Sequence, residues 1–81
     1  VNKLFTLYPN PAENHAMVRL SQTCHTVEYG LFSTSGRQIL GGSQQNIEEF
    51  ELNFSQIPAG MYILRLIADN RLAAFEKLEV R

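Results

Sequence analysis

The feature that most constrains the fold of this chain is a repeated alternation of apolar and polar side chains with a period of two residues. In residues 15–20 (HAMVRL) every second side chain is Ala, Val or Leu, and in residues 49–54 (EFELNF) every second one is Phe or Leu. This alternation places successive side chains on opposite faces of a β-sheet. We therefore expect a strand in each segment, with one buried face and one solvated face.

Further segments fit the same class of structure. Residues 26–32 (TVEYGLF) and 61–67 (MYILRLI) are apolar on both faces, which predicts central strands. Shorter candidate strands occupy residues 3–8 and 37–41, and a last one lies within residues 72–80. Clusters of turn-forming residues separate these segments at 33–36, 40–46, 57–60 and 68–71. The pattern predicts an all-β fold, an immunoglobulin-like antiparallel β-sandwich of about seven strands.

Length and charge limit the classes of protein that fit. The 81 residues allow a single domain, covering residues 1–81. Seven basic and eight acidic side chains give a net charge of −1 without a basic stripe, so nucleic acid is not an expected partner. No transmembrane segment is expected, because the apolar runs stop far short of the roughly 18 to 20 residues that cross a bilayer. The first residues lack the order of a secretory signal, so the chain either stays in the cytoplasm or is a piece of a longer exported protein.

The stretch LYPNPA at residues 7–12 contains two prolines that are separated by one asparagine. Proline has no N–H, fixes φ near about −65° and keeps the preceding residue out of the helical region. Pro9 and Pro11 therefore predict a stiff, non-helical exit that blunts the edge of the first strand. The last strand, within residues 72–80, has no comparable protection, and its edge is expected to be free.

No group of side chains in the sequence predicts catalysis. Cys24 and His25 are neighbours on an extended chain, so they point to opposite faces, and only His15 could join them at a metal. Glu49 and Glu51 share a solvated face, where nothing separates their pKa values. We expect no enzyme activity, no metal and no cofactor, and the single cysteine excludes an internal disulfide.

The aromatic residues fall in or beside apolar phases, and we expect them in the core. The phenylalanines are Phe5, Phe32, Phe50, Phe54 and Phe75. Trp, the best stacking side chain for a sugar, is missing from the chain. An aromatic platform for carbohydrate is therefore less well supported than core packing.

Four segments taken together resemble those of a known family. They are LYPNPA at 7–12, LFSTSGRQIL at 31–40, IPAGMYILRL at 57–66 and FEKLEVR at 75–81. In this order and at these spacings, the chain from Phe5 to Arg81 resembles the C-terminal sorting domain of the type IX (Por) secretion system.

The resemblance marks a set of positions as sorting-motif residues. They are Pro9, Asn10, Pro11, Gly36, Arg37, Gly60, Tyr62, Lys77, Leu78, Val80 and Arg81. The chain departs from the family in two places: Ser33 stands where an acidic residue is frequent, and Lys77 and Leu78 stand where two basic residues are frequent. The first departure predicts a weaker turn hydrogen bond, and the second affects the contact with a receptor.

The resemblance also implies a function. Such a domain follows a cargo on the same polypeptide, is recognised in the periplasm by the outer-membrane translocon, and is removed by a sortase-like peptidase while the cargo reaches the cell surface or the medium. We expect recognition to concentrate on the last strand, through pairing with a receptor strand. A carbohydrate-binding or adhesive β-sandwich and a structural spacer are the alternatives, and a dimer through the free edge strands stays open.

Overall fold

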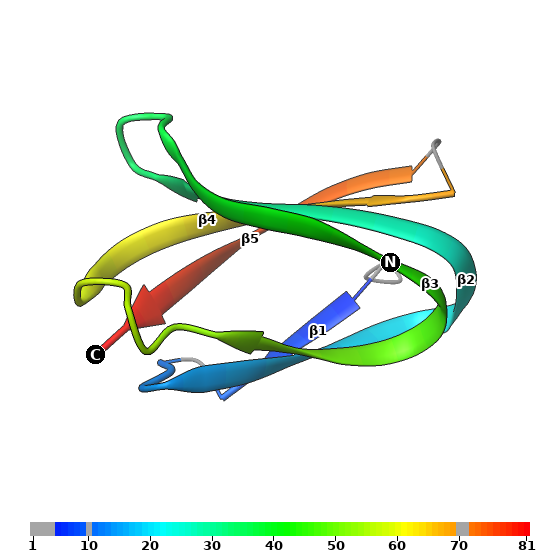
Figure 1. Cartoon of the computed structure of the whole chain (residues 1–81), viewed down its shortest axis with the longest axis horizontal. Helices are drawn as coiled ribbons and strands as arrows, with labels where there is room; N and C mark the ends of the chain where they lie inside the picture. The colour runs from blue at the N-terminus through cyan, green and yellow to red at the C-terminus, as the bar shows by residue number, and fades with distance from the viewer. Residues whose placement is uncertain (1–4, 10, 70–71) are drawn as a thin grey trace.

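We describe the fold from a computed structural model, which places residues 5–9, 11–69 and 72–81. These residues form five strands in one antiparallel sheet (Figure 1). The strands are β1 (Phe5–Tyr8), β2 (His15–Ser33), β3 (Gln38–Asn53), β4 (Gly60–Ala68) and β5 (Leu72–Val80). None of the described segments forms a helix with the length and apolar character that a membrane crossing requires.

The sandwich arises because two long strands each belong to both layers. The first part of β2 pairs with β1 and with the end of β3, whereas its second part pairs with β4 and with the start of β3. The register of the β2–β3 pair shifts between Arg19 and Cys24, and Asn46 on the facing strand has φ 51°. The ribbon bends there and folds the sheet onto itself, as Figure 1 shows at its right-hand side.

Asp69, directly after β4, fixes this bend. Its Oδ1 accepts the backbone N–H groups of His25 at 2.9 Å and Thr26 at 3.0 Å, and its own N–H donates to the Thr26 carbonyl at 2.8 Å. The residue has φ 52°, a left-handed conformation that Asp adopts more readily than most residues. The turn after β4 therefore pins the corner of β2.

The period-two alternation of the sequence is confirmed by the burial of the side chains. Ala16, Val18 and Leu20 are buried, and so are their counterparts at positions 50, 52 and 54 of the segment EFELNF. Both layers contribute to the core, whose largest fully buried side chains are Phe54, Leu31, Leu64, Leu66, Leu78, Val18, Val27 and Cys24. The all-β sandwich class is confirmed, and β2 and β4 are central as predicted.

The predicted count of about seven strands is wrong, because two pairs of predicted strands are continuous. The predicted turn at 40–46 lies inside β3. Its glycines serve close packing across the β2–β3 pair: Gly41 pairs with Gly30, and a Cβ on Gly42 would lie 2.6 Å from the hydroxyl of Tyr29. The glycines there make room for side chains of neighbouring residues and do not reverse the chain.

The prediction that all phenylalanines lie in the core is wrong for two of them. Phe32 is half-buried and Phe75 is 64% exposed, because both occupy the phase of their strands that points away from the second layer. The other three, at positions 5, 50 and 54, are buried.

Asp69→Ala should destabilise the domain, because two backbone N–H groups lose their acceptor and alanine is less tolerant of positive φ. We expect a loss of about 1 to 3 kcal/mol in the free energy of unfolding, measured by urea denaturation. Asp69→Asn is the matched control, since its Oδ1 still accepts both bonds and asparagine tolerates the same backbone. An unchanged urea midpoint for Asp69→Ala would contradict the role of this residue at the bend.

Candidate functional site

The segments that carry the sorting motifs meet at one end of the sandwich. Val80 pairs with Gly60 on one side and forms a parallel bridge with Ala12 on the other, and Tyr62 pairs with Ser33 at the edge of the next hairpin. We call this end the motif end; it consists of residues 9, 11–14, 33–37, 58–62 and 77–81 and lies at the left of Figure 1. The pairing of the strands brings these segments, which are distant in the sequence, to the same end of the sandwich.

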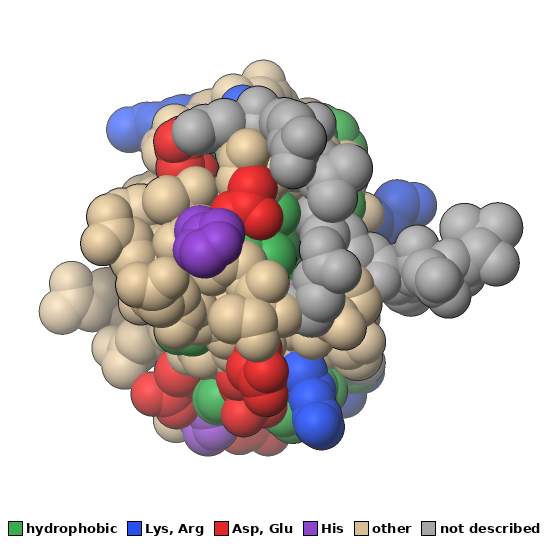
Figure 2. Space-filling model, turned by 90° about the vertical axis from the view of Figure 1, so that its right-hand side faces the viewer, with side chains coloured by type: hydrophobic (Ala, Val, Ile, Leu, Met, Phe, Trp, Pro, Cys, Tyr) green, Lys and Arg blue, Asp and Glu red, His purple; other side chains and the backbone are tan. Residues whose placement is uncertain are grey.

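The opposite end differs in character. It is formed by the bend of β2 and β3 and by the turn after β4, and Figure 2 shows it from outside. Uncharged polar side chains and backbone cover most of this view, with a few scattered charges.

The connection between β1 and β2 contains Pro9 and Pro11, and we call it the proline corner. It joins the first strand to the last. Ala12 is fully buried, donates its N–H to the Glu79 carbonyl at 2.8 Å and accepts the Arg81 N–H at 2.7 Å. Pro9, which follows a cis peptide bond, and Pro11 are exposed, and neither has an N–H with which to extend this ladder. Asn10 lies outside the described residues.

This geometry corrects the expectation that the edge of the last strand is free along its whole length. β5 is an edge strand of the sheet, but its final residues bond to Ala12 of the same chain. Any pairing of β5 with a receptor strand or with a second copy is therefore restricted to residues before Glu79. Such pairing stays a prediction.

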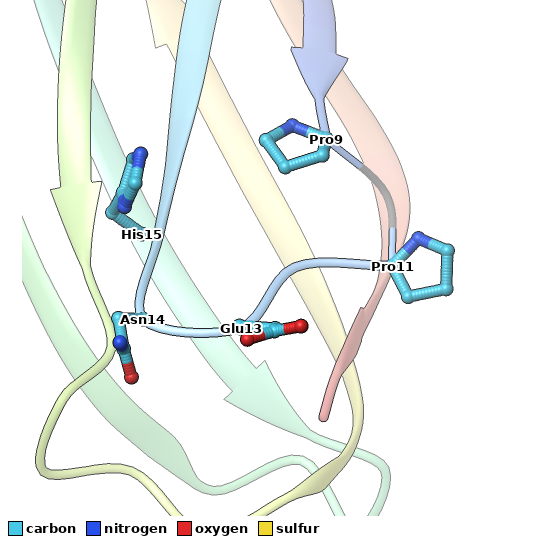
Figure 3. A pocket seen from close by; sticks show the side chains of 5 residues that line it. All are labelled: Pro9, Pro11, Glu13, Asn14 and His15. Atoms are coloured by element: carbon cyan, nitrogen blue, oxygen red, sulfur yellow. The ribbon is translucent and has the colours of Figure 1, made fainter.

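A surface pocket of about 340 Å³ lies beside the proline corner. Its lining residues are Pro9, Pro11, Glu13, Asn14 and His15. Figure 3 shows the two proline rings and the polar side chains around the same turn of the chain. The Asn14 carbonyl accepts the N–H of the buried Phe54 at 2.7 Å, which fixes the turn against the core. The pocket thus has a rigid rim.

The Gly–Arg hairpin between β2 and β3 is held by Ser33. Its N–H donates to the Arg37 carbonyl at 2.8 Å, its carbonyl accepts the Gly36 N–H at 2.9 Å, and its hydroxyl accepts the Arg37 N–H at 3.2 Å. Gly36 has φ 91°, so this position requires glycine for its backbone. The Ser33 hydroxyl thus accepts the turn hydrogen bond at the position where the resemblance implies a frequent carboxylate. The Arg37 side chain is exposed.

The glycine and tyrosine before the core of β4 are structural. Gly60 has φ 156°, and Tyr62 is 7% exposed. The Tyr62 hydroxyl donates to the Pro58 carbonyl at 2.6 Å, so it ties the loop before β4 to the strand. Between them, Met61 points outward and is 47% exposed.

The end of the chain alternates between core and surface. Leu78 and Val80 are buried, whereas Lys77 and Arg81 are exposed. Arg81 Nε lies 3.2 Å from Glu79 Oε2 in an exposed ion pair, which contributes little to stability. Of the motif residues that the structure describes, those exposed at the surface are Pro9, Pro11, Gly36, Arg37, Gly60, Lys77 and Arg81.

The residues weighed for chemistry are far from forming a reactive site. Cys24 is buried and His25 is exposed, so they point to opposite faces as predicted, and burial together with the nearby Asp69 charge raises the pKa of the thiol. Glu49 is exposed and accepts a hydrogen bond from the Tyr8 hydroxyl, which raises the pKa of that phenol. Within residues 5–9, 11–69 and 72–81, no three His, Cys, Asp or Glu side chains gather closely enough to hold a metal ion.

Two features were missed by sequence reasoning. The Asp–Asn pair after β4 signalled a turn, but nothing in the sequence tied Asp69 to residues 25 and 26. The outward position of Phe75 could have been found from its phase, because Leu78 and Val80 alternate with it and face the core.

Comparison with known proteins agrees with this picture. A family model described as "Secretion system C-terminal sorting domain" matches residues 6–81. Karilysin from Tannerella forsythia is 27% identical over 77 residues, which cover 83% of this chain but only 16% of Karilysin. The crystal structure of CopC from Methylosinus trichosporium OB3b superimposes with a TM-score of 0.60 at 11% identity, covering 94% of this chain and 90% of that chain.

The likeness to CopC shows the fold alone, because the identity is so low. The family match is of another kind, since it extends over nearly the whole chain, including all four motif segments. On this ground the protein belongs to the family of secretion system C-terminal sorting domains.

Proposed function

We propose that this chain is the sorting signal of a larger exported protein. The type IX translocon recognises it and directs the attached cargo across the outer membrane to the cell surface or the medium. The observation that carries the proposal is the family match over residues 6–81. The gathering of the motif segments at one end of the fold supports it further.

The exposed part of the motif end is suited to recognition. Arg37, Lys77 and Arg81 are exposed basic residues of the motif end, which also exposes two prolines, and proline surfaces are rigid before binding. The buried motif residues hold these groups in place by packing and backbone bonds. Recognition and folding thus depend on different members of the same motifs.

The direction of β1 supports a cargo that stays clear of the motif end. Phe5 pairs with Leu20 beside the bend, and Tyr8 pairs with Met17 nearer to the proline corner. The described part of the chain thus starts beside the bend, which favours a cargo on that side of the domain. The motif end then stays open to the translocon while the cargo is attached.

Cleavage by a sortase-like peptidase, transit through the periplasm and the final fate of the cargo belong to the same proposal. The likeness to one segment of the much longer Karilysin supports the attachment to cargo. A cut upstream of β1 leaves the folded domain intact and needs no opening of the core.

A carbohydrate-binding module is the second candidate, and one observation favours it. Phe75 is 64% exposed on an open sheet face, where an aromatic ring can stack on a sugar. Binding of the isolated chain to a glycan array, lost in Phe75→Ser, would support this alternative over a sorting role.

The main test uses a periplasmic reporter fused upstream of residues 1–81 in a bacterium with a type IX secretion system. Removing the domain should keep the reporter in the periplasm, and Arg37→Gln with Lys77→Gln should lower export by about tenfold through lost charge contacts. Arg19→Gln, an exposed arginine outside the motif end, is the control. Truncation of residues 77–81 is less informative, because it also removes Leu78 and Val80 from the core. Delivery of the reporter to the cell surface without the domain would contradict the proposal.

A second test follows the proposed cleavage. In the same bacterium, the exported reporter should be shorter than its periplasmic precursor by about the mass of this domain, which immunoblotting of the two fractions measures. A strain whose sortase-like peptidase is inactive should keep the reporter in its full-length form. Full-length reporter on the surface of the parent strain would contradict cleavage and leave sorting itself intact.

A further inference from the structure

One sheet face of the domain carries several large apolar side chains among its charged ones, although no other layer of the described residues covers it. It lies on the outside of the second part of β2 and of β4 and β5, and we call it the outer apolar face. Its residues are Phe32, Met61, Ile63, Ile67 and Phe75, with Phe75 64% and Met61 47% exposed. The solvated side of an antiparallel sheet is ordinarily polar, and a contiguous exposed apolar patch marks an interaction site.

Arg65 stands in the middle of this face. It pairs with Gly30 of β2 on one side and with Phe75 of β5 on the other. Its guanidinium carbon lies 4.9 Å from the centroid of the Phe32 ring, in a cation–π contact. Its Nε is buried and has no hydrogen-bond partner among the described residues.

The position of Phe32 depends on a glycine. A Cβ on Gly30 would lie 2.9 Å from Cε1 of Phe32, so the ring rests over the place where another residue would have its side chain. Phe32 in turn supports Arg65. Glu28 lies on the same face, opposite Ile67, but no ion pair joins it to Arg65 in the described structure. The Arg65 side chain is therefore held against the Phe32 ring, and no carboxylate of the described residues forms an ion pair with it.

We propose that the outer apolar face is a docking surface for a protein of the export machinery that carries a carboxylate among apolar side chains. A carboxylate of the partner can accept charge-assisted bonds from the terminal nitrogens of the guanidinium, whereas the Nε is buried beneath them and out of its reach. This inference rests on the proposed function and deepens it. Met61 follows Gly60 directly and pairs with Glu79, so the face continues into the motif end without a gap.

Charge on the face selects a protein over the other occupants. Glu28 and Glu79 belong to the same outer face, where Arg65 and Lys77 balance them, so the face has no excess of positive charge that would attract an anionic lipid surface. A second copy would bring its own Arg65 and Lys77 together with its two glutamates, so it adds no net negative charge to the face. A carboxylate partner has neither disadvantage.

The experiment compares two matched double variants in the reporter fusion. Met61→Ser with Arg65→Gln changes the outer apolar face, and Met17→Ser with Arg19→Gln makes the same changes on the outside of the other layer. Urea denaturation verifies that both variants are folded. We expect export to fall by about tenfold or more for the first variant and to stay unchanged for the second. Arg65→Glu should export less than Arg65→Gln, because it repels the carboxylate.

The outcomes separate this inference from the proposed function. If removal of the domain blocks export but Met61→Ser with Arg65→Gln exports like its control, the docking surface is wrong and the sorting role stands. If domain removal leaves export unchanged, the sorting role itself fails. Equal export of the Arg65→Glu and Arg65→Gln variants would contradict the proposed carboxylate on the partner.

Two measurements on the purified chain test the other occupants. A concentration-dependent dimer in sedimentation equilibrium, lost in the Met61→Ser, Arg65→Gln variant, would assign the face to a second copy. Flotation with vesicles of phosphatidylethanolamine and phosphatidylglycerol, lost in the same variant, would assign it to lipid. Either result would overturn docking to a protein, and their absence together with reduced export would support it.

Discussion

The arrangement of the motif end depends on the two backbone hydrogen bonds between Ala12 and the end of β5. Without them β5 would be attached to the sheet through β4 alone. With them, the first connection of the chain and its last residues become one structural unit, although about seventy positions separate them along the sequence. Because Ala12 is fully buried, no larger side chain fits between the proline corner and Val80 without moving one of them.

This unit explains why segments so distant in sequence act together. The bridge to Val80 fixes the proline corner, Val80 pairs with Gly60, and Tyr62 pairs with Ser33 at the base of the Gly–Arg hairpin. Each motif thus positions the next by main-chain contacts. The exposed side chains at positions 37, 77 and 81 require nothing more from the fold than this frame.

Much of this fold could be predicted from the sequence, and the failures have physical causes. Alternation with a period of two identifies the buried face of each strand, but it is the same on both sides of a bend, so it cannot tell one bent strand from two. Gly41 and Gly42 have the composition of a turn, and only the neighbouring Tyr29 and Gln38 side chains explain their place in a strand. The motif residues were identified from the family resemblance, whereas their meeting at one end depends on register between distant strands, which no local pattern encodes.

The outer apolar face is best understood against the size of the domain. A chain of 81 residues buries only about 60 to 65% of its unfolded surface, so each large apolar side chain left outside is a considerable part of the burial that is attainable. Phe75 and Met61 nevertheless point away from the core, while the absence of a side chain on Gly30 leaves room for the Phe32 ring that contacts Arg65. Folding alone leaves these two exposed side chains uncovered. The arrangement is favourable when a second surface covers the phenylalanine and the methionine and supplies a negative charge opposite Arg65.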